Sequence, residues 1–268
     1  IIRNIKAKLQ NRQGAGIFQP YRDLAKLLRK DEVISDTASW IFRFFPFLMF
    51  AVSLVIGFSI PVFSTLAIHH STADFLVVTY LFALGAFLLA IAGLDTASAF
   101  GGTGSSREMT MAALTEGGLL FSLLAVAVLT QQTNLAGMME TLAKLPLLTW
   151  APLLIAFIGF IIALLCENAR YPFDNPATHL ELTMIHEAMI LEYSGKRLAL
   201  VEWSAYNKLL SFIVLGANLF FPWGIASSLE PLALLWGLLL VLAKALVITV
   251  FVGVLESVAP KLRYFRLP

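Results

Sequence analysis

The sequence is poor in the residues that most enzymes use for chemistry. It contains one cysteine, Cys166, and four histidines among 268 residues, and only 13% of its residues are charged. A single cysteine excludes a disulfide framework, a Cys-ligated iron–sulfur cluster and a thiolate zinc site within the chain. The histidines lack zinc spacing and the arrangement of a bis-histidine haem site, and no Walker, GxGxxG or GxSxG motif occurs. The chain is therefore predicted to be non-catalytic, with no metal or redox cofactor of its own.

Long apolar runs are abundant. Hydrophobic residues make up 59% of the chain, and the mean hydropathy is +0.82. A helix that crosses a bilayer needs roughly 20 apolar residues. Six runs of suitable length are predicted to be transmembrane helices, at residues 40–62, 75–94, 111–129, 150–166, 198–223 and 232–255. Pro46 and Pro61 are expected to kink or bound the first of them. The pattern predicts an all-α polytopic membrane protein with one domain and no internal repeat.

The basic residues alternate along the chain. Segments 1–39 and 168–197, the connection before residue 111 and the tail 256–268 hold 15 lysines and arginines, whereas the other connections hold only Lys144. The positive-inside rule therefore predicts that 1–39, 168–197 and 256–268 are cytoplasmic. Segment 1–39 is predicted to form a loop and a short amphipathic helix at 21–28, which would contact either lipid or a partner. The net charge of +2, without a continuous basic stripe, argues against nucleic acid.

One polar stretch, residues 167–195, interrupts the apolar sequence. Six carboxylates lie in it or just beyond it, and they are Glu167, Asp174, Glu181, Glu187, Glu192 and Glu202. On a helix, Glu181, Ile185, Ala188 and Glu192 would share one face, with His186 and Glu187 on others. Carboxylates on several sides favour a water-filled cleft that faces the cytoplasm, where desolvation and like charge raise carboxyl pKa values. An ordinary acidic surface loop is the alternative.

Two ionisable residues lie within predicted membrane helices, away from the helix ends. They are Glu116 and Lys244, whereas Arg43 lies near a helix start and can extend towards the headgroups. A charge at mid-bilayer costs at least about 2.5–3.5 kcal/mol on insertion scales, so each needs a partner or a function. A proton relay and a structural ion pair are both open for Glu116 and for Lys244.

Several motifs in order resemble one family. ENARYPFD at 167–174, followed by LEYSG at 191–195, resembles the membrane subunit-one family shared by respiratory complex I and the energy-converting nickel–iron hydrogenases, which include formate hydrogenlyase. The similarity extends to NRQGAGIFQPYRDLAKLL at 11–28, to GLDTASAFGGTGSSRE at 93–108 and to PKLRY at 260–264. The 93–108 segment looks like a loop of the hydrogenase branch that precedes a helix with an intramembrane glutamate, here Glu116.

The resemblance implies a fold of about eight membrane helices. Since Ile1 is not an initiator methionine, the sequence is expected to be a fragment that lacks the first and last of them. The implied partners are hydrogenase-like large and small subunits of a hydrophilic arm, which carry iron–sulfur clusters and in some relatives a nickel–iron site, together with antiporter-like membrane subunits and the lipid bilayer. The implied location is the prokaryotic inner membrane. Quinone or lipid is the implied ligand, since this subunit forms much of the quinone cavity in complex I.

The resemblance also suggests residue roles. The expected proton relay comprises Glu116, Glu167, Glu181, His186, Glu187, Glu192, Glu202 and Lys244. The expected arm junction comprises Asp23, Asp95, Arg107, Arg170 and Asp174. Relatives usually carry carboxylates where this chain has Ala177 and His179; His186, able to titrate near neutral pH, is expected to compensate with Glu187.

Three functions follow as hypotheses. The first is an ion-translocating subunit in which electron transfer in the docked arm shifts the pKa values of coupled carboxylates and drives charge inward through Glu116. The second is a scaffold that only anchors the arm, and a quinone-binding subunit of a NADH dehydrogenase-type complex is a variant of this architecture. The third, an autonomous secondary transporter, would need inverted repeats, which the sequence lacks.

Overall fold

The structure is a computed structural model that describes residues 1–35, 37–65, 73–146, 151–174, 184–226 and 228–259. Within these ranges the chain forms ten α-helices and no β-strand. The helices are α1 (Ile2–Leu9), α2 (Gln19–Leu28), α3 (Trp40–Ser59), α4 (Phe75–Asp95), α5 (Ala99–Thr130), α6 (Leu135–Lys144), α7 (Ala151–Glu167), α8 (His186–Ile190), α9 (Gly195–Phe220) and α10 (Pro231–Val258). The prediction of an all-α fold is confirmed.

All six predicted membrane helices are present. Five of them, α3, α4, α5, α9 and α10, are long and apolar enough to cross a bilayer, and α7 is a shorter apolar helix of 17 residues. Side chains at the N-caps explain several of the starts, because Ser39, Asp74 and Ser98 each accept a hydrogen bond from a backbone N–H of the first turn. Helix α3 continues through Pro46 and ends two residues before Pro61. The chain is therefore a multi-pass membrane protein.

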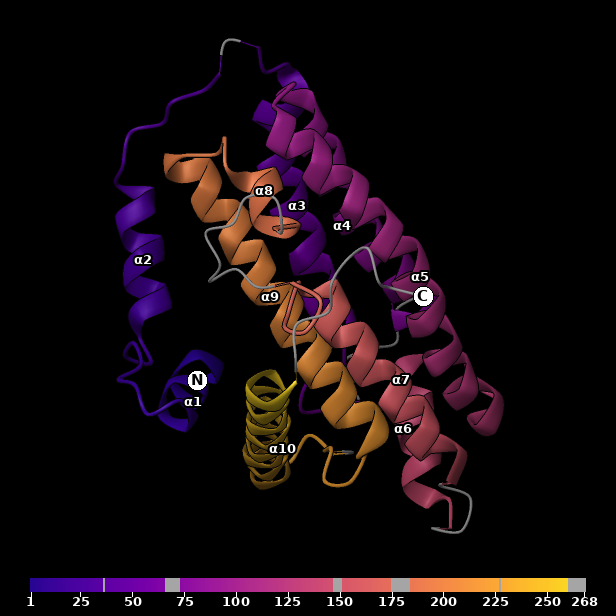
Figure 1. The fold of residues 1–268 in the computed structure, drawn as a ribbon. Helices are drawn as coiled ribbons and strands as arrows, with labels where there is room; N and C mark the ends of the chain where they lie inside the picture. The colour runs from indigo at the N-terminus through magenta and orange to yellow at the C-terminus, as the bar shows by residue number, and fades with distance from the viewer. Residues whose placement is uncertain (36, 66–72, 147–150, 175–183, 227, 260–268) are drawn as a thin grey trace.

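The main bundle consists of α3, α4, α5, α7 and α9 (Figure 1). Phenylalanine side chains join three of these helices: Phe212 of α9 stacks on Phe82 of α4 with 4.1 Å between ring centroids, and it lies 5.9 Å from Phe160 of α7. All three rings are buried. Stacked and tilted aromatic pairs at such separations stabilise a core beyond the area that they bury.

Polar side chains connect neighbouring helices inside this bundle. The hydroxyl of Ser105 on α5 donates to the carbonyl of Ala90 on α4 at 2.8 Å, and Ser122 on α5 donates to Ala156 on α7 at 2.6 Å. In a membrane the backbone offers few free acceptors, so such bonds fix how helices are rotated against each other. Helix α5 is thereby held on both sides.

Helix α5 corrects one sequence prediction. The motif at 93–108 predicts a loop, with the membrane helix starting at Met111, but α5 already begins at Ala99 and runs for 32 residues. The glycines that suggest a loop serve close packing instead. A Cβ atom at Gly104 would lie 2.9 Å from the carbonyl oxygen of Ile185 and from Cβ of Ala188, so only glycine admits the neighbouring segment around α8.

Helices α1 and α2 lie outside the bundle (Figure 1). Helix α2, predicted at 21–28, begins two residues earlier and packs against α9, while α1 packs against α10. The sequence analysis did not predict α1, α6 or α8. The proposed shared helical face of Glu181, Ile185, Ala188 and Glu192 is not formed as a long helix in the described residues, because α8 spans only 186–190.

Candidate functional site

A cavity of about 600 Å³ lies inside the helix bundle. Residues of α1, α3, α4, α5, α7, α9 and α10 line it, together with the segment 168–174 that follows α7. Its wall from α3 and α4 is apolar and includes Met49, Val52, Ile56, Leu81, Phe82 and Leu89. The cavity therefore has a face that suits hydrocarbon.

The remaining wall of the cavity is densely charged. It holds six carboxylates, namely Glu108, Glu167, Asp174, Glu187, Glu202 and Glu256. It also holds five basic side chains, Arg3, Lys6, Arg12, Arg170 and Lys208, and the imidazole of His186. Since carboxylates outnumber the cations by one, the wall has a slight negative excess with the imidazole neutral. Such a site attracts protons and other cations.

Glu167 and Lys208 form a buried ion pair in this wall. The ammonium nitrogen of Lys208 on α9 lies 2.6 Å from Oε2 of Glu167 at the end of α7. Only 16% and 3% of the two side chains, respectively, are exposed. A buried charge of this kind is tolerated because its partner and hydrogen bonds replace water. The pair joins α7 to α9 at the level of the cavity.

Glu256 of α10 is shared between two cations. Its carboxylate lies 3.5 Å from the guanidinium of Arg170 and 3.6 Å from the ammonium of Lys6 on α1. Lys6 also lies 4.9 Å from the ring centroid of Tyr171. Burial lowers the pKa of Arg170, and the negative charge of Glu256 opposes that effect. One carboxylate therefore holds α1 and the 168–174 segment together.

Asp174 folds the polar stretch back onto the cavity. This carboxylate is almost fully buried and accepts hydrogen bonds from the backbone N–H groups of Ile185, at 3.2 Å, and His186, at 3.1 Å. Two backbone donors stabilise an ionised carboxylate. Asp174 thereby positions the start of α8 against α5.

Glu187 and His186, at the start of α8, respond to this environment in opposite directions. Burial raises the pKa of Glu187, and the charges of Glu202 and Asp174 raise it further. Burial also lowers the pKa of His186 to about 4, with a smaller contribution from the ammonium of Lys208. The expectation that His186 titrates near neutral pH is therefore wrong, because the desolvated imidazole stays neutral. Glu187 is the group of the two that can exchange a proton at higher pH.

The other predicted relay residues are distributed unevenly. Glu202 lines the cavity and accepts a hydrogen bond from the hydroxyl of Tyr206 at 3.4 Å, whereas Glu192 is exposed and lies outside the cavity wall. Glu116 is half-buried on α5, and no ion pair links it to another residue in the described parts of the chain. Lys244 donates to the carbonyl of Phe221 at 2.6 Å, at the end of α9. Glu181 lies outside the described residues, as do Ala177, His179 and the tail 260–268.

The predicted arm-junction residues mostly have partners within the chain. Asp95 accepts hydrogen bonds from the Ser39 backbone and hydroxyl and from the Phe42 N–H, so it ties the end of α4 to the start of α3. Arg107 donates to the carbonyl of Met184 at 3.3 Å. Asp23 accepts a bond from the Gln19 side chain within α2. Arg170 and Asp174 line the cavity, so these two are the junction candidates that also contact the polar site.

The sequence analysis missed Glu108, Lys208 and Glu256. All three line the cavity, and Lys208 lies in an apolar run where the cost of a buried charge could have identified it, as it did for Glu116. Glu108 belongs to the motif GGTGSSRE, whose glycines favour a loop and so conceal its place on a helix. In the described part of the chain, no group of three or more His, Cys, Asp or Glu residues is arranged to hold a metal ion.

Comparison with known proteins identifies the family. The family model for NADH dehydrogenase matches residues 1–268. Hydrogenase-4 component C of Escherichia coli (strain K12) is 36% identical over 267 residues, which cover 98% of this chain and 82% of the relative. The chain belongs to the NADH dehydrogenase subunit-1 family.

Other members of the subunit-1 family show the same range. Formate hydrogenlyase subunit 4 of E. coli (strain K12) is 33% identical and covers 98% of this chain and 85% of its own length. A membrane-family relative from the NADH-quinone oxidoreductase of Syntrophotalea carbinolica is 28% identical over 99% of this chain and 82% of its own length. A chain in the structure of the membrane-bound sulfane sulfur reductase, an archaeal respiratory membrane complex, shares the fold with a TM-score of 0.85 at 20% identity, covering 99% of this chain and 85% of that one.

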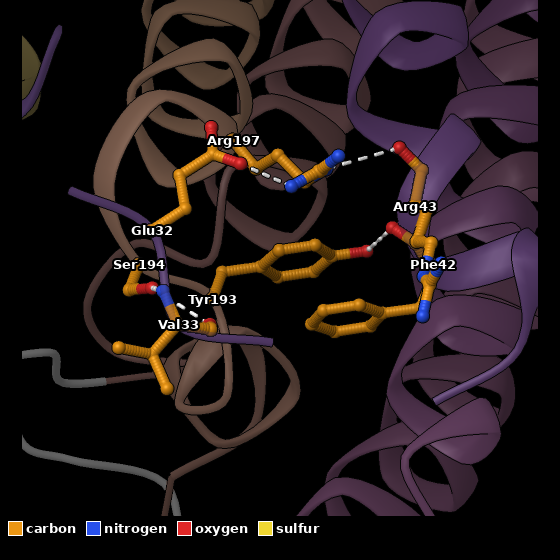
Figure 2. A network of polar contacts seen from close by, with 7 residues as sticks. All are labelled: Glu32, Val33, Phe42, Arg43, Tyr193, Ser194 and Arg197. Atoms are coloured by element: carbon orange, nitrogen blue, oxygen red, sulfur yellow. Dashed lines mark hydrogen bonds and ion pairs between the residues drawn. The ribbon is translucent and has the colours of Figure 1, made fainter. Parts of the chain in front are cut away.

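The motif LEYSG forms a structural clamp in this subunit-1 chain (Figure 2). The ring of Tyr193 stacks on Phe42 with 3.9 Å between centroids and an angle of 6°, and its hydroxyl donates to the Phe42 carbonyl at 3.2 Å. Ser194 exchanges hydrogen bonds with the backbone of Val33, at 2.8 and 2.9 Å. Gly195 has a φ of +53° and lies against the backbone at 30–31, where a Cβ atom would meet carbonyl oxygens at 2.9 Å.

Arg197 extends this clamp to two further segments. Its guanidinium forms an ion pair with Glu32 and donates to the carbonyl of Arg43 at 3.2 Å (Figure 2). The residues of the clamp are therefore Glu32, Val33, Phe42, Arg43, Tyr193, Ser194 and Arg197, and they connect the segment after α2, the start of α3 and the start of α9. Burial raises the pKa of the Tyr193 phenol, with the charge of Asp95 second, so the hydroxyl stays a hydrogen-bond donor.

Proposed function

We propose that this chain is the coupling membrane subunit of a hydrogenase-like or complex I-like redox complex. In this role it docks the hydrophilic electron-transfer arm and relays protons through carboxylates into the membrane. The supporting observation is the cavity inside the bundle, whose wall combines six carboxylates with five basic side chains. Burying so many ionisable groups is costly within a membrane protein, and such groups usually mark an ion pathway.

The proposed orientation places the charged end of the cavity at the cytoplasm. The lysines and arginines outside the apolar runs favour that side by fifteen to one. The partners in this proposal are hydrogenase-like large and small subunits, which carry iron–sulfur clusters and in some complexes a nickel–iron site, and antiporter-like membrane subunits. Relatives of this chain are named as components of hydrogenase, formate hydrogenlyase and NADH-quinone oxidoreductase, which supports an assembly in the prokaryotic inner membrane.

The mechanism begins at the segment that follows α7. Arg170 and Asp174 are the predicted contacts to the arm, and both also hold elements of the cavity wall in place. A change of charge in the arm would alter the Arg170–Glu256 contact and the position of α8. Glu187, whose pKa is already raised, would then take up or release a proton. Glu202, Glu167 and Glu108 would pass the charge towards Glu116.

We expect Glu187→Gln and Glu116→Gln to lower the number of protons pumped per electron by about tenfold, at the low end of what loss of a positioned proton donor costs. Glutamine keeps the size of the side chain but cannot carry a proton between groups. Glu181→Gln should act in the same way. The measurement is proton uptake in proteoliposomes that contain the whole complex, with electron transfer followed in parallel. Glu140→Gln, on the exposed surface of α6, is the matched control.

The scaffold hypothesis predicts a different result from the same preparation. If the chain only anchors the arm, all three glutamine variants will pump normally, and only Arg170→Ala and Asp174→Ala will act, through loss of arm subunits from the purified complex. Unchanged pumping in Glu187→Gln, Glu116→Gln and Glu181→Gln would therefore remove the relay. Loss of pumping with intact composition would remove the pure scaffold.

The apolar wall of the cavity favours a second candidate function, binding of a quinone or of a lipid tail. Met49, Val52 and Phe82 face a volume that is large enough for a drug-sized molecule. A photoreactive quinone analogue should then label peptides of α3 and α4 in the intact complex, and excess quinone should compete. Val52→Trp, which fills the apolar part of the cavity, should abolish labelling. Labelling that quinone does not reduce would discard quinone as the ligand.

A further inference from the structure

Helix α2 carries a basic outer face that the proposed coupling function does not use. Arg22, Lys26, Arg29 and Lys30 are all exposed, and with Ala25 they line a shallow groove. Their spacing of four, three and one residues places them on one side of the helix. The opposite side packs against α9, with Leu24 buried. Asp23 lies at the flank of the buried side and is engaged by Gln19.

An apolar ridge runs beside the basic face. Phe18, Tyr21 and Leu28 are 69%, 70% and 41% exposed, and Ile17 just before them is 57% exposed. The rings of Phe18 and Tyr21 contact each other with 6.5 Å between centroids. In a helical projection this ridge lies between the basic face and the side that packs against α9. A basic stripe beside an apolar aromatic stripe is typical of helices that lie in the headgroup region of a bilayer.

The fold places α2 at a membrane boundary. The segment after α2 is fixed to the start of α9 by the hydrogen bonds between Val33 and Ser194. The segment before it leads from α1, which is fixed to the end of α10 by Lys6 and Glu256. Helix α9 crosses the membrane and α10 returns, so the start of α9 and the end of α10 lie on the same side. Helix α2 is held between these two ends, at the level of the lipid headgroups.

We infer that the outer face of α2 binds the phosphodiester headgroups of anionic phospholipids in that leaflet. Four cations face outward without an acidic side chain among them, which complements a negatively charged lipid surface. A protein interface fits less well, because lysine is depleted in the cores of such interfaces. This inference goes beyond the proposed coupling function and does not depend on it, since α2 contributes no side chain to the cavity wall.

The test compares two photoactivatable lipids in nanodiscs that contain the intact complex. One disc type contains a phosphatidylglycerol probe and the other a phosphatidylcholine probe, at equal density. We expect the glycerol probe to label the peptide 17–30 at least about fivefold more than the choline probe, since one basic side chain near an anionic surface contributes about that factor. The double variant K26Q/R29Q should lose this preference. The double variant K144Q/K196Q removes two exposed charges elsewhere and should keep it.

Three results would overturn the inference. The first is equal labelling by both probes in the natural sequence, and the second is an unchanged preference in K26Q/R29Q. The third is the absence of lipid labelling together with zero-length cross-links from 17–30 to another subunit, which would assign the face to a protein partner. Subunit composition and electron transfer are measured on each variant, and both should match the natural complex. A variant that fails to assemble is replaced by the single changes K26Q and R29Q.

Discussion

Replacing Lys208 with methionine is expected to destabilise the folded chain by about 3–5 kcal/mol, the usual cost of removing one partner from a buried ion pair. The reason is that Glu167, with 3% of its side chain exposed, would keep a negative charge that nothing compensates at 2.6 Å. Methionine matches the length of the lysine stem, so loss of packing contributes little. Unfolding of the purified chain in mixed micelles, followed by circular dichroism, measures the change.

A double-mutant cycle separates the pair from other effects of the change at Lys208. In the variant that combines Lys208→Met with Glu167→Gln, the uncompensated charge is absent and most of the lost stability should return. Lys196→Met, at an exposed lysine in the first turn of α9, should change the free energy of unfolding by less than about 0.5 kcal/mol. Equal stability of Lys208→Met and Lys196→Met would show that the pair does not stabilise the fold.

Truncating Tyr193 to alanine is expected to cost a similar amount, about 3–5 kcal/mol, as for other large aromatic side chains in a core. The ring is 4% exposed and stacks on Phe42, and its hydroxyl bonds to the backbone of α3. Removing it opens a cavity between the starts of α3 and α9. The readout is the free energy of unfolding, together with the rate at which protease cleaves the segment 29–39.

Tyr193→Phe isolates the contribution of the hydroxyl. It keeps the stacked ring and removes one hydrogen bond, so the expected cost is only about 1 kcal/mol. The clamp would then still hold the segment 29–39, and protease would cleave it at nearly the natural rate. If alanine and phenylalanine gave the same small effect, the stacking of Tyr193 on Phe42 could not be what fixes this segment.

The membrane helices are predictable from the sequence because their signal is local. A run of apolar residues must be helical in lipid, whatever surrounds it, since its backbone groups have no other partners. The prediction for helix α5 is too short for the opposite reason. Glycines at 101, 102 and 104 disfavour an isolated helix, and only the packing of the Ile185–Ala188 segment against Gly104 explains their presence in this one.

The site is less completely predictable than the fold. Glu167, Asp174, Glu187 and Glu202 are identified by the crowding of carboxylates, and the cavity brings them together. Their cationic partners come from distant segments, as Lys6 of α1 and Lys208 of α9 show, and one sequence does not state which helices are neighbours. Asp95 shows the same difficulty, because its hydrogen bonds to the start of α3 depend on a contact across more than fifty residues. The pKa of His186 likewise depends on burial that only the fold determines.

The length of α5 has a mechanical consequence. A helix of 32 residues measures about 48 Å, well beyond the roughly 30 Å of hydrocarbon in a bilayer, so it must tilt steeply or project into water. Arg107, which grips the polar stretch at Met184, and Glu116 stand on this one rod with no break between them. A shove at the surface would therefore be delivered to the intramembrane glutamate as a rigid displacement, much as a lever carries force past its fulcrum. The paired glycines at 117 and 118, around which a Cβ would meet open space, mark the place where the rod can bend.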